Sequence, residues 1–124
     1  EFEEGQTYEA IQAMYFYGLD NVGVYVDVNG QQVDGPTKEV MNIEPLDARI
    51  ESFGASVIRV DGHDIRALVD AAAMEHAGKP HFILADTNTA QGVLLLEGRK
   101  PYLHFVRFHD EAEKAEFLRF WEAM

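Results

Sequence analysis

The stretch VGVYVDVNG at residues 22–30 decides the fold of this 124-residue chain. Most of its first seven side chains are β-branched or aromatic, and turn-forming residues lie on both sides, Asp20-Asn21 before it and Asn29-Gly30 at its end. A short apolar segment bounded in this way is typical of an interior strand of a sheet. We therefore predict a strand over residues 22–28.

Helical and extended patterns alternate along the rest of the chain. They predict helices over 7–17, from Pro45 to Phe53, from Ile65 toward Gly78 and over 110–122, strands over 55–60 and 81–85, and an extended segment over 102–106. The helix over 7–17 is apolar over much of its girth, so we expect it to be mostly buried. We place Pro45 at the first helical position, and we expect Asp64 and Asp110 to cap the helices that follow them.

This alternation predicts the fold class. Connections long enough to hold a helix join parallel strands, so we expect an α/β fold with a three-layer parallel sheet and helices on both faces. An open sheet of this kind has about five or six strands, and only three are predicted here. The chain also opens on Glu1 rather than Met. We expect residues 1–124 to be the C-terminal part of a single domain, truncated at its N-terminal side.

Composition excludes several classes of function. Asp and Glu number 22 against 10 Lys and Arg, which gives a formal net charge of −12. This charge repels phosphate backbones and anionic lipids, so we expect neither nucleic-acid nor membrane partners. The absence of cysteine excludes disulfide scaffolds and thiolate metal sites. No apolar run approaches the roughly 20 residues of a spanning helix, and we expect a cytoplasmic protein.

The dipeptide Asn29-Gly30 has two interpretations. It is the strongest short signal for a hairpin, in which residues 31–35 would fold back on the preceding strand. Alternatively, it lies at the carboxyl end of a parallel strand, where α/β sheets bind ligands. There, amide and carbonyl oxygens suit Mg²⁺.

Glutamates and histidines are the other candidates for chemistry. Glu4 and Glu9 lie at the start of the first predicted helix, either as solvated charges or as carboxylates made more basic by partial burial. His63 reads as a turn residue beside Asp64, and His104 as a structural residue of the extended segment.

Four segments together resemble the thiamine diphosphate domain of transketolases: EGQTYEA, LDNVGVYVDVNGQQVDG, FGASVIRVDGHD and KPHFILADT. The resemblance covers about residues 3–90 and is nearest to the N-terminal subunit of two-subunit transketolases. It implies a thiamine diphosphate-binding fold and the cofactors thiamine diphosphate and Mg²⁺, with Ca²⁺ as an alternative ion.

The resemblance also implies a cofactor-binding segment. In this family a Gly-Asp-Gly motif and a later Asn bind the metal that holds the diphosphate. Asn29, Gly30 and Gln31 would contact the cofactor, with the Asn29 side chain and the Gln31 carbonyl as metal ligands. The Gly-Asp-Gly would end just before Glu1, so its metal-binding Asp is absent from this sequence.

Three catalytic assignments follow from the same resemblance. Glu4 matches a glutamate at the family's dimer interface that takes part in proton communication between cofactors, and Glu9 matches a second family glutamate. His104 falls at the spacing of a family His that assists proton transfer on the sugar, although Phe105 replaces the Gly that follows it. The loop 87–92 loosely matches the family's Thr-x-x-Gly-x-Gly loop.

The implied function is transfer of a two-carbon ketol unit between sugar phosphates, as in pentose phosphate chemistry. The partner would be a second copy or a second subunit that carries the pyrimidine-binding domain, because the glutamate that activates the cofactor comes from there. The chain alone would then be inactive. A non-catalytic fragment acting as a folded or oligomeric subdomain is the alternative, and another thiamine diphosphate enzyme, such as a deoxyxylulose-phosphate synthase or 2-oxo acid dehydrogenase, is a third interpretation.

Overall fold

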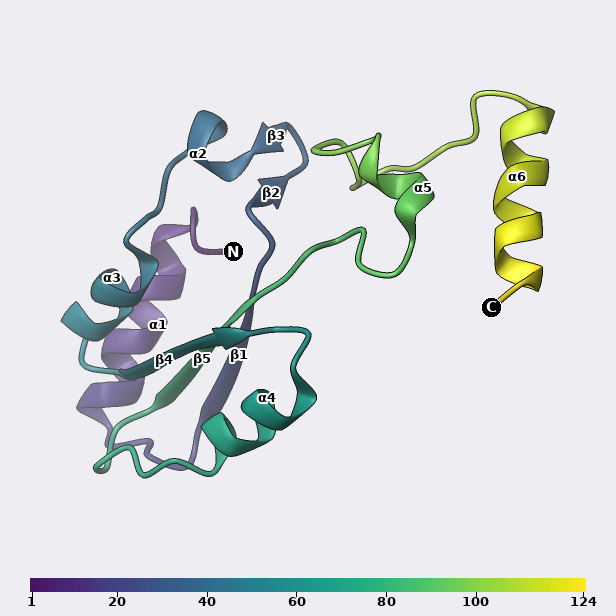
Figure 1. The fold of residues 1–124 in the computed structure, drawn as a ribbon. Coiled ribbons are helices and arrows are strands. Elements are labelled where there is room, and N and C mark those ends of the chain that lie inside the picture. The colour runs from purple at the N-terminus through teal and green to yellow at the C-terminus, as the bar shows by residue number, and fades with distance from the viewer.

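The computed structural model describes every residue from Glu1 to Met124. Its main sheet has three parallel strands in the order β1-β5-β4, formed by Gly23–Val28, His81–Asp86 and Ser56–Asp61. Helices α1 (Gly5–Phe16) and α3 (Leu46–Ser52) lie on one face, and α4 (Ile65–Ala72) covers the other (Figure 1). The predicted α/β fold with helices on both faces is confirmed.

Strand β5 is central, and residues 81–85 are all buried. Because side chains alternate along a strand, Phe82 and Leu84 point to one face and join a core with Ile11 of α1 and Ile50 of α3. Full burial of each such side chain contributes about 1.5–3 kcal/mol. This core fixes the sheet on which the candidate site is built.

The predicted strands agree with the structure to within one residue at each end, but four predictions about helices are wrong. The first helix begins earlier, at Gly5, and only Ile11 of α1 is buried, whereas Phe16 is 80% exposed. One side of α1 packs on the sheet, and its remaining apolar side chains face outward. Pro45 is the N-cap of α3, and α4 ends at Ala72, well before Gly78.

Short elements connect the main ones. A two-residue hairpin pairs β2 (Gln31–Gln32) with β3 (Gly35–Pro36), and α2 (Thr37–Val40) follows. None of the helices combines the length and apolar character that a membrane crossing needs.

The C-terminal segment extends away from the sheet. Helix α5 (Leu94–Glu97) leads through turns to α6 (Glu111–Glu122), which stands apart from the three strands in Figure 1. The structure contains no strand over the predicted extended segment 102–106: the backbone there is irregular and bends at His104 and Phe105. Asp110 caps α6 as predicted, accepting a hydrogen bond from the Glu113 N–H at 2.8 Å.

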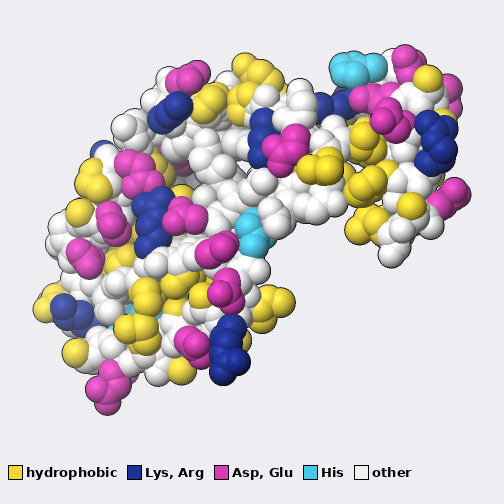
Figure 2. All heavy atoms as spheres, in the orientation of Figure 1, with side chains coloured by type: hydrophobic (Ala, Val, Ile, Leu, Met, Phe, Trp, Pro, Cys, Tyr) yellow, Lys and Arg dark blue, Asp and Glu magenta, His cyan; other side chains and the backbone are white.

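Hydrophobic side chains gather on the segment that carries α5 and α6 and also over the body that contains the strands, and acidic side chains are scattered over most of the visible face (Figure 2). Trp121 of α6 is 72% exposed. Within the C-terminal segment, residues 94–122, Phe108 packs against Phe117 with ring centroids 5.5 Å apart, and Arg99 forms an ion pair with Glu113. The pKa of Glu113 is held below its usual value, chiefly by the hydrogen bond from Arg99.

Candidate functional site

The candidate site lies where the parallel strands end. Val28 of β1 and Asp61 of β4 are both in register with Asp86 of β5, so the three strands end at the same edge. Ligands of open α/β sheets bind at the carboxyl ends of the strands.

Asn29 organises the turn that follows β1. Its Nδ2 donates to Asp27 Oδ2 at 2.9 Å, and its Oδ1 accepts from the Gln31 N–H at 2.9 Å. Gly30 has a φ of 68°, a left-handed conformation that glycine adopts without steric cost. Residues 31–32 pair with 35–36 and not with β1, so the interpretation of Asn29-Gly30 as a hairpin turn on β1 is wrong.

The loop after β5 contacts this turn. The Gln31 side-chain amide donates to Thr89 Oγ1 at 3.1 Å, and the Thr87 hydroxyl donates to the Asp27 carboxylate. Two segments 58 residues apart in sequence are therefore joined at the end of the sheet.

Two pockets open beside the turn. One, of about 260 Å³, is lined in part by Asn29, Gly30, Gln31 and Glu44. The other, of about 230 Å³, is lined by Asn29, Gln31, Gln32, Thr89, Leu103 and His104. The structure thus brings together four residues singled out from the sequence, namely Asn29, Gly30, Gln31 and the exposed His104.

Glu4 and Glu9 are not brought to these pockets. Both are exposed, and Glu4 is the N-cap of α1 without a side-chain capping hydrogen bond. Of the two interpretations of these glutamates, that of solvated charges is confirmed for this chain, and that of partial burial is wrong.

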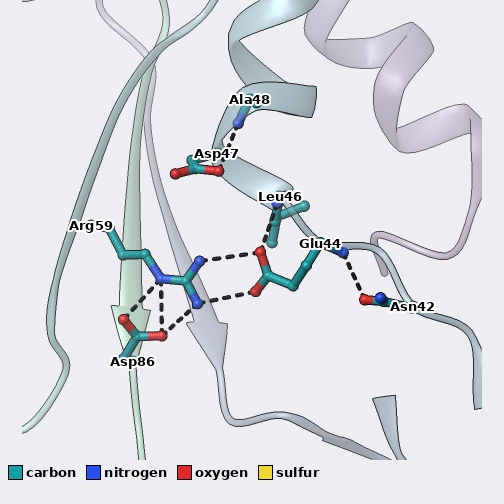
Figure 3. Close-up of polar contacts among 7 residues, drawn as sticks. All are labelled: Asn42, Glu44, Leu46, Asp47, Ala48, Arg59 and Asp86. Atoms are coloured by element: carbon teal, nitrogen blue, oxygen red, sulfur yellow. Dashed lines mark hydrogen bonds and ion pairs between the residues drawn. The ribbon is translucent and has the colours of Figure 1, made fainter. Parts of the chain in front are cut away.

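A cluster of ion pairs around Arg59 includes Glu44, which lines the first of the two pockets (Figure 3). The Arg59 guanidinium of β4 contacts Asp86 at 2.8 Å and Glu44 at 3.1 Å, and Glu44 Oε2 also accepts from the Leu46 N–H at 2.8 Å. The pKa of Glu44 is lowered, chiefly by the hydrogen bond that its carboxylate accepts from Arg59. The pKa of Arg59 is raised, most by its hydrogen bond to Asp86 and next by that to Glu44. The cluster ties the pocket-lining Glu44 to β4 and β5.

Replacing Arg59 with Met is expected to lower the free energy of unfolding at pH 7 by about 1 kcal/mol, the scale of partly exposed, solvent-screened ion pairs. Because the folded-state pKa of Glu44 is lowered, its contribution is complete above the ordinary value of 4.5 and is lost as the pH falls through the folded value. Urea unfolding at pH 7 and at about pH 3 measures this change. Arg66→Met, which removes an arginine without an ion pair, is the control. An equal loss at both pH values would assign the effect to packing of the Arg59 stem.

The donors at the end of β1 fit part of a magnesium site. Mg²⁺ prefers oxygen ligands in an octahedron, and the Asn29 amide oxygen and the Gln31 carbonyl are such donors. No cluster of three or more His, Asp or Glu side chains is arranged to hold a metal. These residues would therefore supply a share of the ligands, and diphosphate oxygens and a further carboxylate would supply the rest.

Sequence reasoning missed two contacts. His63 Nε2 accepts a hydrogen bond from the Asn88 N–H at 2.8 Å, although the two residues are 25 positions apart. The Arg59 cluster was also missed, yet a lone arginine within the apolar strand 55–60 is a signal that a carboxylate partner is needed.

The comparisons with known proteins identify the family. Residues 1–103 match the family described as "Transketolase, thiamine diphosphate binding domain". A transketolase family protein of Sinorhizobium fredii is 44% identical over 99% of this chain and 44% of its own length. One of the subunits of the apulose-4-phosphate transketolase of Actinobacillus succinogenes is 38% identical over 93% of this chain and 42% of its own length.

The fold comparison points the same way. The crystal structure of transketolase from Campylobacter jejuni superposes with a TM-score of 0.65 and 26% identity, covering 95% of this chain and 21% of that one. The chain spans less than half the length of these two curated relatives. On the family match and the shared fold, the chain belongs to the transketolase family, with residues 1–103 in its thiamine diphosphate-binding domain.

Proposed function

We propose that this chain is part of a thiamine diphosphate- and Mg²⁺-dependent transketolase that transfers a two-carbon ketol unit between sugar phosphates. The observation that carries the proposal is the Asn29-Gly30-Gln31 turn at the carboxyl end of β1, joined to the loop after β5 through Gln31 and Thr89. On this proposal residues 1–124 are the C-terminal part of one cofactor-binding domain, in a cytoplasmic enzyme.

Each part of the site has a task in this proposal. Asn29 and Gln31 hold the metal that binds the cofactor diphosphate, and Gly30 allows the backbone to approach it. When bound, thiamine diphosphate would supply the nucleophilic chemistry for breaking and forming a carbon–carbon bond of the sugar. His104, on the second pocket, holds or moves a proton on the sugar.

The exposed aromatic side chains at the end of α1 support the proposal of a partner. Phe16 and the C-cap residue Tyr17 are 80% and 72% exposed, and their rings pack edge to face with centroids 5.1 Å apart, an exposed aromatic pair of the kind that marks protein interfaces. We propose that a second copy, or a second subunit with the pyrimidine-binding domain, covers this surface. The similar protein of Actinobacillus succinogenes is itself named as one subunit of a transketolase. Glu4 and Glu9, both on this helix or at its start, would then lie at the interface and relay protons there.

Replacing Glu4 with Gln in the full-length protein is expected to slow activation by thiamine diphosphate, or to alter its cooperativity, with little effect on folding. The physical reason is that the amide keeps the shape of the side chain and removes its ability to take up a proton. Progress curves started by cofactor addition measure the activation rate. Glu75→Gln, at an exposed position in the loop after α4, is the matched control. Loss of the dimer alone would instead assign Glu4 a structural role.

The function itself is tested by calorimetric titration of the full-length protein with thiamine diphosphate in Mg²⁺, with and without its partner, and with Ca²⁺ in a parallel series. We expect saturable, metal-dependent binding and ketol transfer between sugar phosphates in the assembled protein. Absence of binding in every arm would overturn the proposal and favour the alternative, a non-catalytic subdomain.

A further inference from the structure

The turn Gly62-His63, which directly follows β4, is packed on the end of β5. The Gly62 N–H donates to the Asp86 carbonyl at 2.8 Å. A Cβ added at Gly62 would lie 2.4 Å from Thr87 Cγ2 and 2.9 Å from the Asp86 carbonyl oxygen. Since no side chain fits there, the turn and the strand end are held in contact by backbone geometry.

His63 extends this contact into the loop 87–92. Its Nε2 lies 2.8 Å from the Asn88 nitrogen. A backbone N–H can only donate, so Nε2 is the acceptor and the ring hydrogen of neutral His63 is on Nδ1. The His63 N–H in turn donates to Asp61 Oδ1 at 2.9 Å, which fixes the turn that presents the ring.

Asn88 makes further hydrogen bonds, one within the loop 87–92 and one to α5. Its Oδ1 accepts from the Ala90 N–H at 3.0 Å, and its Nδ2 donates to Glu97 Oε1 at 3.0 Å. The pKa of Glu97 is held below its usual value by hydrogen bonds from Lys100 and then Asn88. The backbone N–H of Asn88 is thus held by His63, and its side chain by Glu97 of α5.

The residues on either side of Asn88 contact the candidate site. The Thr87 hydroxyl donates to Asp27, and Thr89 Oγ1 accepts from the Gln31 amide. His63 itself lines neither of the two pockets beside Asn29. Its effect on the site is therefore transmitted through the loop.

We propose that His63 is a positioning residue of the site: by accepting the hydrogen bond of the Asn88 N–H it fixes the loop 87–92, and through Thr87 and Thr89 it fixes Asp27 and Gln31, the two residues that are hydrogen-bonded to Asn29. The inference rests on the proposed function for its consequence in catalysis. The contact itself does not depend on that function.

The test compares His63→Ala, which removes the acceptor, with His63→Gln, whose Oε1 can accept at a similar reach, in the full-length protein. His109→Ala, which removes an exposed ring without hydrogen bonds, is the control. Hydrogen exchange of the backbone amides in residues 86–92 is measured by mass spectrometry without cofactor. One lost hydrogen bond corresponds to about a threefold to tenfold change, so we expect exchange to rise by that factor in His63→Ala and to return toward wild type in His63→Gln.

Steady-state kinetics of the protein assembled with its partner supply the second readout. In His63→Ala we expect the KM for thiamine diphosphate to rise by a similar factor while kcat changes little, with recovery in His63→Gln. Unchanged exchange in His63→Ala, or a loss of kcat that Gln does not restore, would overturn the inference. A wild type without transketolase activity would overturn the proposed function instead, and the exchange measurement would still decide whether His63 holds the loop.

Discussion

Replacing Asn29 with Ala in the full-length protein is expected to weaken binding of thiamine diphosphate in Mg²⁺ by about tenfold to a hundredfold, the loss that follows removal of a residue supporting a metal site. The substitution removes the proposed metal-binding oxygen. It also removes the acceptor that fixes the Gln31 N–H and the donor to Asp27. Calorimetric titration measures the change in affinity.

The fold is expected to survive this change, because the lost hydrogen bonds lie beyond the paired part of β1, which ends at Val28. Asn21→Ala is the matched control, since this exposed asparagine precedes β1 at the opposite end of the strand. Affinity equal to that of the wild type would contradict the assignment of Asn29 as a metal ligand. Equal loss of affinity in the absence of metal would assign Asn29 to the turn rather than to the ion.

The strands could be predicted from sequence because each is a short apolar run with turn residues at its ends, and local composition is enough to define such runs. The degree to which α1 is buried could not be predicted in this way. Apolar side chains around most of the segment 7–17 predict a buried helix. The three-stranded sheet covers only one side of this helix, so Phe16 and Tyr17 remain exposed. What covers an apolar helix depends on partners that its own sequence does not contain.

The site shows the same division between local and distant information. The Asn29-Gly30 turn was visible in the sequence, and the choice between hairpin and ligand loop depended on β1 pairing with the distant β5. The contact between Gln31 and Thr89, and that between His63 and Asn88, join loops that no spacing rule relates. These contacts exist because parallel strands bring their carboxyl ends to one edge, so the loops after β1, β4 and β5 converge there.

Replacing Gly62 with Ala is expected to lower the free energy of unfolding by about 1–3 kcal/mol, the usual cost of forcing extra atoms into a packed site. The added methyl group would meet Thr87 Cγ2 and the Asp86 carbonyl oxygen at distances that real Cβ atoms do not tolerate. The carbonyl belongs to the backbone at the end of β5 and cannot rotate away as a side chain would. The turn must therefore separate from the strand, or the loop that begins at Thr87 must move.

Urea unfolding separates this prediction from a general intolerance of glycine positions, with Gly23→Ala as the control. An added Cβ at Gly23 meets nothing within 4 Å, so that variant should match the wild type. A Gly62→Ala protein as stable as Gly23→Ala would show that the turn after β4 separates from β5 without cost, and would weaken the case that it fixes the loop 87–92. If the expected loss occurs, titration of the folded variant with thiamine diphosphate should also show reduced affinity. Displacing Thr87 and Thr89 removes the groups that hold Asp27 and Gln31. A single methyl group outside both pockets would then act on the Asn29-Gly30-Gln31 turn through the loop alone.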